Sequence, residues 1–430
     1  MDLTRWGVSK HSMHVAIAKH QQGIVMHSSD AYHMQGIRDF TVVNTKYIGG
    51  NSIVTLAPKP NREALCPSCA TRNAILHNTG EVRKIVGLPV GPHKTFFKVP
   101  VYRVACLECG ASCREPISFC SRYARHSKAL ERSVIELRRE MSIKAVANFV
   151  NLDWRAVKDI EKDNLRMKYR RIALKNVRII GIDEIYVGRS KYKTIVRDLE
   201  SGAVLFVGEG KGGDALKPFA KRIRSSRKCK IEVVAMDMSS GYAAWVKNEL
   251  KTAVIVFDHF HVIQLMNKKL DELRRRTIAE LSEEEKKLLK SKRFLLLKGL
   301  EKLNAEEVNE LEKLKATFED LSLVHAMKER LRCIYRIAEN QYDARILFEQ
   351  WIIDARSSGI ACLKTMAKTL SRLLEGVLGY WKYNQLTSAG MEGFNNKIRW
   401  LIRQAYGFRD PEYFKLKIFD LPTCSIVKKI

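Results

Sequence analysis

Three acids occupy positions from which their carboxylates could act together. Asp183 follows an apolar run, Val177–Ile182, that is typical of a buried strand, and Asp237 follows a second such run, "EVVAM". Glu392 falls in the first turn of a helix that we expect to begin near Ala389. Because strand ends of an α/β sheet converge on one crevice, we expect the two aspartates to lie close together.

Carboxylates gathered in this way repel one another and lose hydration, so they need a compensating charge. A divalent ion with oxygen ligands, Mg²⁺ or Mn²⁺, is the usual partner. Two such ions about 3.5–4 Å apart can activate a water or a 3′-OH and stabilise the leaving oxygen of a phosphodiester. The acids therefore predict metal-dependent chemistry on nucleic acid, and the alternative is ordinary structural acids at strand ends.

Neighbouring residues are alternative candidates for the same site. Asp258 also ends an apolar run, in "VIVFDHFH", and by sequence alone it competes with Asp237. His259 and His261 could orient DNA or support a metal shell, or form a structural pair. Glu184 should point to the opposite face of the strand from Asp183, so we do not expect it to be a ligand.

Two short cysteine motifs predict a second metal site. "CPSC" supplies Cys66 and Cys69, and "CLECG" supplies Cys106 and Cys109. Paired C-x2-C turns are typical of a structural, tetrahedral Zn²⁺ site, and Gly110 gives the second turn a permissive backbone. The alternative is four buried free thiols. We expect Cys113 and Cys120, which follow closely, to be bystanders.

Residues 142–161 have the pattern of a helix-turn-helix. A short helix at 142–149 precedes a turn, and Asp153 is a plausible N-cap for a helix from Trp154 to Glu161. Arg155, Lys158 and Lys162 would face DNA. From residue 114 to residue 175 there are 16 Lys and Arg against 8 Asp and Glu, which favours a polyanionic partner. The alternative is a helical hairpin with a solvated basic face.

The remaining pattern predicts the elements that must hold the acids. After the strand at 177–182 we expect a hairpin across "ESG", then alternating helices and strands, which indicates an α/β sheet of mixed direction. Tyr242 and Trp245 are expected in the core, with base stacking as the alternative. A charged, proline-free block at roughly 275–380 should be entirely helical, with capping boxes at "SEEE" and "NAEE".

The composition indicates which classes of binding partner to expect. The formal net charge is +29 over 430 residues, which favours nucleic acid first and an anionic membrane surface second. We find no apolar run of about 18 residues, and therefore expect no membrane span. "GEGKGG" lacks the Lys-Ser/Thr ending of a phosphate-binding loop, so we expect no NTP requirement.

As an ordered set, these motifs resemble bacterial insertion-sequence transposases of the ISL-three group, a branch of the DDE transposases with an RNase H-like catalytic core. The resemblance covers roughly residues 41–420, and residues 1–40 have no counterpart that we can place. The motifs that carry it are "CPSC"…"CLECG", the helix-turn-helix, "GIDE", "VAMDMSSGY", "VFDHFHV" and "MEGFNNKIR".

The resemblance implies a multidomain α/β protein in which Asp183, Asp237 and Glu392 are the catalytic triad. Glu375 is the alternative third acid, disfavoured because it lies in an apolar helix. The expected parts are an unassigned segment (1–40), a zinc-binding domain (41–122), a helix-turn-helix domain (123–172), an RNase H-like core (173–274 and 384–430) and an all-α insertion (275–383).

The expected activity is that of a DNA transposase which binds the terminal inverted repeats of its element and cuts and transfers strands with Mg²⁺ or Mn²⁺. Its partners would be double-stranded DNA and further copies of the chain, as a homodimer or larger assembly, in the bacterial cytoplasm at the nucleoid. A DNA-binding regulator, or an RNase H-like nuclease without strand transfer, is the alternative function.

Overall fold

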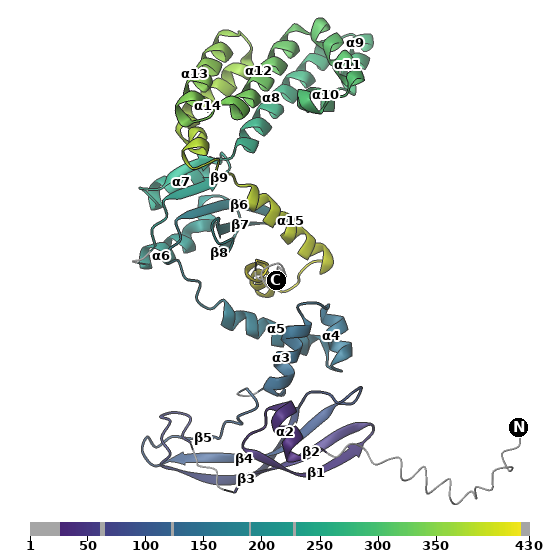
Figure 1. Ribbon diagram of the computed structural model, residues 1–430, viewed down its shortest axis with the longest axis vertical. Coiled ribbons are helices and arrows are strands. Elements are labelled where there is room, and N and C mark those ends of the chain that lie inside the picture. Colours follow the sequence, from purple (N-terminus) through teal and green to yellow (C-terminus); the bar gives the residue numbers. More distant parts are fainter. Residues whose placement is uncertain (1–25, 61–64, 122–123, 189–190, 227–228, 423–430) are drawn as a thin grey trace, which may run out of the picture. The chain divides into compact units, whose positions relative to one another are not determined.

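The computed structural model describes residues 26–60, 65–121, 124–188, 191–226 and 229–422 (Figure 1). Two compact units meet in the sequence between Lys168 and Tyr169. Both are built around a mixed β-sheet. Across the described ranges, no helix combines the length and the apolar character needed to cross a membrane.

The first unit begins with a five-stranded sheet of order β1-β2-β4-β3, with β5 paired to β4. A short helix, α2 (Ser28–Gln35), packs on it through Ala31, and Phe40, Phe97 and Phe119 fill the core beneath. The long strand β3 begins just after the first cysteine turn, and β4 ends at the second. The strands are β1 (Phe40–Ile48), β2 (Asn51–Pro58), β3 (Ala74–Val86), β4 (Thr95–Cys106) and β5 (Ser112–Arg114).

Three helices complete the first unit: α3 (Lys128–Leu137), α4 (Ile143–Phe149) and α5 (Trp154–Lys168). They share a small apolar core that contains Leu130, Val134, Val146 and Val157. The carboxylate of Asp153 accepts a hydrogen bond of 2.7 Å from the Arg155 N–H, which confirms the predicted cap. The last helix is two turns longer than expected, because Leu165 is also buried and extends its apolar face.

The second unit contains a sheet of order β10-β9-β6-β7-β8. β6, β7 and β8 form an antiparallel meander, whereas β9 and β10 run parallel to β6. The predicted hairpin and the two later strands are therefore confirmed. The strands are β6 (Ile179–Gly188), β7 (Lys191–Asp198), β8 (Val204–Glu209), β9 (Val233–Met236) and β10 (Val254–Phe257).

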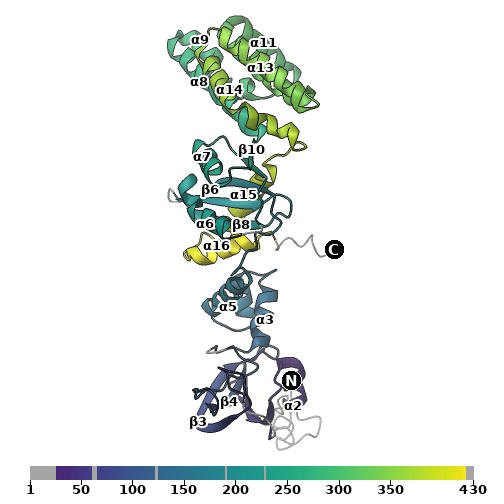
Figure 2. The same ribbon diagram turned by 90° about the vertical axis from the view of Figure 1, so that its left-hand side faces the viewer.

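Helices cover both faces of this sheet (Figures 1 and 2). On one face lie α6 (Lys217–Ser225), preceded by a 3-10 turn at Gly213–Leu216, and α7 (Ser240–Glu249), packed on Ile180 and Ile182 of β6. On the other face lie α15 (Ala389–Gln404) and α16 (Pro411–Asp420), packed on Ile185 and Ile195. Alternate residues of β6 thus face different layers, as the pleat of a strand requires.

The chain from β10 to α15 is helical, and the two predicted capping boxes are present at Ser282 and Asn304. α14 lies directly against β10: a Cβ added at Gly376 would fall 2.5 Å from the Phe257 ring, so only glycine permits this approach. The elements are α8 (His259–Glu280), α9 (Glu283–Lys290), α10 (Arg293–Leu297), a 3-10 turn (Leu300–Lys302), α11 (Ala305–Thr317), α12 (Glu319–Ile337), α13 (Gln341–Ser357) and α14 (Ala361–Lys382).

Candidate functional site

The structure brings Asp183 and Asp237 together. β6 and β9 are parallel neighbours with Ile182 opposite Met236, so the residues that follow this pair, Asp183 and Asp237, lie at the same level of the two strands. Asp183 lies within electrostatic range of Asp237. The prediction that Asp183 ends its strand is wrong, because β6 continues to Gly188 and Asp183 pairs with Ile195 of β7. Asp237 does follow the end of its strand, β9, and the register still sets the two aspartates beside each other.

The surroundings of the Asp183 carboxylate disfavour its ionised form. Burial raises its pKa; the backbone N–H of Glu184 counteracts this, and the Asp237 charge adds to the rise. His261, in the first turn of α8, is close enough to favour the ionised form. A partly buried carboxylate beside a second one is stabilised by a cation, so the charge pattern fits a metal site.

Helix α15 lies across β6 at this point. A Cβ at Gly181 would fall 2.9 Å from the Met391 side chain, so the glycine of the "GIDE" motif permits the close packing of helix on strand. One turn later, Asn395 Nδ2 donates a hydrogen bond of 2.7 Å to Asp183 Oδ2. Glu392 precedes Asn395 by three residues and therefore lies on the same side of the helix, one turn nearer its start.

Glu392 is exposed, and the three acids do not form a closed cluster. Within the described part of the chain, the only group of three or more His, Cys, Asp or Glu side chains with ligand atoms within 4.8 Å of one another is the set of four cysteines.

Asp258, the rival of Asp237, has a structural task. Its Oδ1 accepts the N–H of Phe260 and caps α8, while its Oδ2 accepts the Ser388 N–H at 2.9 Å and the Ser388 hydroxyl at 2.5 Å. Burial alone would raise its pKa, but His259, Ser388 and the Phe260 N–H hold the pKa well below its usual range. With both oxygens engaged, Asp258 fixes the segment just before α15.

The other side chains that the sequence singled out also have structural contacts. Glu184 points to the opposite face from Asp183 and accepts a 3.3 Å hydrogen bond from the Tyr242 hydroxyl, as its position on the strand predicts. Tyr242 and Trp245 are buried in the core, which confirms the packing interpretation. Glu375, the disfavoured third acid, pairs with Arg345 on α13.

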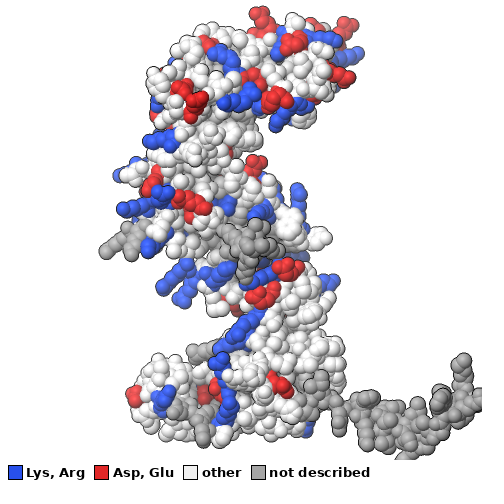
Figure 3. Space-filling view, viewed as in Figure 1, with Lys and Arg blue, Asp and Glu red and all other residues white. Residues whose placement is uncertain are grey.

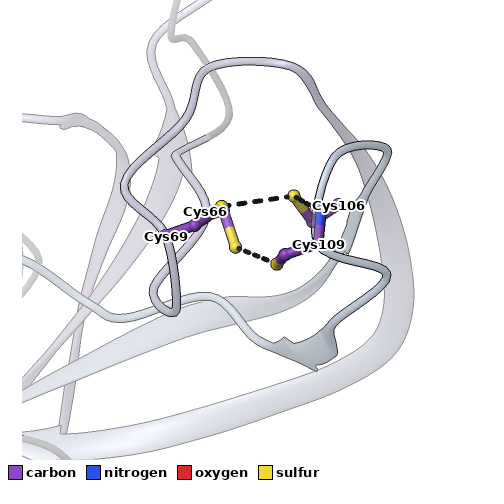
Figure 4. A group of neighbouring side chains, drawn as sticks. All are labelled: Cys66, Cys69, Cys106 and Cys109. Atoms are coloured by element: carbon purple, nitrogen blue, oxygen red, sulfur yellow. Dashed lines mark hydrogen bonds between the residues drawn. The ribbon is translucent and has the colours of Figure 1, made fainter.

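The four cysteines that we predicted to bind zinc lie together. Figure 4 shows the sulfurs of Cys66, Cys69, Cys106 and Cys109 facing one another, with Cys66 to Cys109 at 3.7 Å and Cys69 to Cys106 at 3.6 Å. A tetrahedral Zn²⁺ with bonds of about 2.3 Å would separate its sulfurs by about 3.8 Å. The geometry therefore fits a zinc-sized ion, and both cysteine turns contain a positive φ, at Ala70 and at Gly110.

The thiols themselves favour a cation. The backbone N–H groups of Cys69 and Ser68 lower the pKa of Cys66 to about 6. The Thr71 backbone works in the same direction on Cys69, but burial and the surrounding thiols raise the pKa of Cys69 to about 12. Four thiolates can form here only if a positive ion offsets their repulsion. Cys113 and Cys120 lie outside the group, as expected.

The predicted DNA-facing residues lie on α5. Arg155 is exposed in the first turn, beside the exposed ring of Trp154, and Lys158 and Lys162 are half-buried further along. A buried ion pair of 2.7 Å between Arg138 and Glu161 fixes α5 against the end of α3. Basic side chains are spread over both units, mixed with acids on the helical block (Figure 3).

The chain combines a helix-turn-helix in one unit with an acid-bearing α/β sheet in the other. This combination is typical of enzymes that act on DNA, and comparison with known families agrees with it. The profile described as "Transposase" of family ISL3, the ISL-three group, matches residues 180–418. The profile "Helix-turn-helix domain of transposase family ISL3" matches residues 115–163.

Individual relatives agree with these profiles. The chain is 30% identical to the transposase for insertion sequence element IS1001 of Bordetella parapertussis, over 82% of this chain and 87% of that protein. It is 25% identical to the transposase for insertion sequence element IS1557 of Mycobacterium tuberculosis, over 85% and 87%. The chain belongs to the ISL3 family of transposases, as its motifs indicated.

Sequence reasoning missed the residues that hold α15 in place. Asn395 binds Asp183, Ser388 binds Asp258, and the Arg197 guanidinium donates to the Gly390 carbonyl and lies 4.2 Å from the centre of the Phe394 ring. Asn395 stands within the "MEGFNNKIR" motif, so its place in that motif was the one available signal.

Proposed function

We propose that the chain is a DDE-type DNA transposase whose catalytic acids are Asp183, Asp237 and Glu392. One observation carries the proposal: Asp183 within β6 and Asp237 just after β9 follow paired residues of neighbouring parallel strands, and the helix packed on β6 bears Glu392. Asp183 and Asp237 would hold Mg²⁺ or Mn²⁺ from the sheet, and Glu392 would complete the site from α15. When bound, these ions activate a water or a 3′-OH and neutralise charge on the leaving oxygen.

We also propose that the second unit is an RNase H-like core interrupted by a helical insertion. The antiparallel meander followed by two parallel strands supports such a core, formed from residues 173–274 and 384–430. The helices between β10 and α15 support an insertion, which we place at residues 275–383. Asp258, the residue that follows β10, accepts a hydrogen bond from Ser388 and so links the two parts of the proposed core.

The first unit would recognise the terminal inverted repeats of the element. The four cysteines suit a structural Zn²⁺ in a domain at residues 41–122, and the helix-turn-helix at 123–172 would bring Arg155, Lys158 and Lys162 to DNA. Residues 1–40 receive no role. We further propose that the protein acts on target DNA and works as a homodimer or larger assembly on the two ends. Its location would be the cytoplasm, at the nucleoid. No NTP is required.

The test uses DNA that carries the element's own ends. We expect the full chain to nick or cut at the ends with Mg²⁺ or Mn²⁺, not with EDTA, and to join the freed 3′-OH to a second DNA. Asp183→Asn, Asp237→Asn and Glu392→Gln should retain binding of the ends and lose cutting and joining. Binding without cutting under every metal condition would instead favour the regulator, and cutting without joining would favour the nuclease.

A further inference from the structure

We infer that Asn395 is a positioning residue of the acid site, which holds the Asp183 carboxylate for the divalent ion through its amide nitrogen and keeps a buried amide oxygen without a donor beside it. This inference rests on the proposed function. It concerns a residue that the triad does not include, and it makes α15 the source of two groups of the site: Glu392 in its first turn and Asn395 one turn later.

The first observation is a part-buried hydrogen bond between distant parts of the chain. Asn395 is 3% exposed, and its Nδ2 lies 2.7 Å from Asp183 Oδ2. The other oxygen of Asp183 accepts the Glu184 N–H, also at 2.7 Å. Each carboxylate oxygen therefore has one donor, which fixes the rotation of the group and leaves further lone pairs free.

The second observation is an unsatisfied acceptor. Asn395 Oδ1 is buried and has no hydrogen-bond partner among the residues that the structure describes. Rotating the amide would not help, because the oxygen would then face the Asp183 carboxylate and be repelled by it. The oxygen is thus held without a donor, which costs stability in the absence of a ligand. Amide oxygens bind hard divalent ions directly and accept hydrogen bonds from the waters that these ions hold.

The third observation is that Asn395 cannot easily move away. Met391, Phe394 and Ile398 of the same helix are buried against the sheet. The carbonyl of Gly390 is held by Arg197. Asn396, the next residue, is exposed and accepts a hydrogen bond from Arg399 instead. It is therefore a matched control with the same side chain, on the same helix, outside the site.

The experiment measures Mn²⁺ binding to the full, zinc-loaded chain by calorimetry, with Asp183→Asn as the reference that lacks the site. We expect Asn395→Ala to weaken Mn²⁺ binding about 10- to 100-fold, as removal of a residue that orients a metal ligand does. Asn396→Ala should bind as the wild type does. Asn395→Leu, which restores the volume without the amide, should be as weak as Asn395→Ala.

A purely structural role would give a different result. In that case Asn395→Leu would recover the affinity, or the maximal rate of end cleavage would fall with no change in the Mn²⁺ concentration at half-maximal rate. Either result would overturn the inference, as would wild-type affinity in Asn395→Ala. If the wild type and Asp183→Asn bind Mn²⁺ equally, the proposed catalytic site itself fails, so the two failures are distinguishable.

Discussion

The contact between Ser388 and Asp258 allows a quantitative prediction. Ser388 donates both its N–H and its hydroxyl to Asp258 Oδ2, and both residues are buried. Ser388→Ala removes the hydroxyl bond of 2.5 Å and keeps the backbone bond. A hydrogen bond to a charged group contributes about 1.5–3 kcal/mol, and we expect the lower half of that range because one donor remains.

The assay is thermal unfolding of the second unit together with end cleavage. A loss of about 2 kcal/mol should lower the unfolding temperature by about 4–8 °C in a unit of this size. The cleavage rate should fall further than stability explains, because the segment that leads into α15 is loosened. Ser201→Ala is the matched control: Ser201 also donates its hydroxyl to an aspartate, Asp198, but it is exposed.

The dependence on pH follows from Asp258. Its pKa is held below the usual range, so its contribution to stability is fully present above the unfolded-state pKa of about 3.9. The contribution is lost as the pH falls through the lower pKa of the folded state. The difference between Ser388→Ala and the wild type should therefore be constant from about pH 8 to pH 5 and shrink in stronger acid. An unfolding temperature within 1 °C of the wild type at pH 7 would refute the reasoning.

Further predictions concern both units. Cys66→Ser should release zinc and lower the unfolding temperature of the first unit, whereas Cys113→Ser should keep its zinc, as measured by metal analysis and melting curves. Because burial and Asp237 raise the pKa of Asp183, its ionised form is unfavourable at neutral pH without a cation; in melting curves added Mg²⁺ should therefore stabilise the wild type and leave Asp183→Asn unchanged. Arg155→Ala should reduce by about one the slope of log affinity for the element ends against log salt, with Arg345→Ala unchanged.

Local patterns predicted much of this fold. The hairpin of β7 and β8 and the capping boxes of α9 and α11 depend on residues within a few positions of one another, and they are present as expected. The opposite orientations of Asp183 and Glu184 follow from the two-residue repeat of a strand. The cysteine cluster was predictable because each C-x2-C turn already fixes half of the ligands.

The features that could not be predicted from the sequence are contacts between distant segments. Asn395 meets Asp183 across 212 positions, and Ser388 meets Asp258 across 130. No local periodicity encodes such a pair, since each partner is a common polar residue in its own element. By sequence Asp258 and Asp237 looked alike, and only their contacts separate them: three donors from Phe260 and Ser388 reach the Asp258 carboxylate, whereas Asp237 Oδ1 accepts the Ser239 N–H.

The most direct measurement locates the metal itself. Fe²⁺ in place of Mg²⁺, with ascorbate and peroxide, cuts a protein backbone beside the position where the ion is bound. We predict cuts near Asp183, Asp237 and Glu392 in the full chain, suppressed by excess Mg²⁺ and absent in Asp183→Asn. Cuts that Mg²⁺ suppresses near Asp258 or Glu375 instead, or no such cuts at all, would contradict the proposal that these three acids hold the catalytic ions.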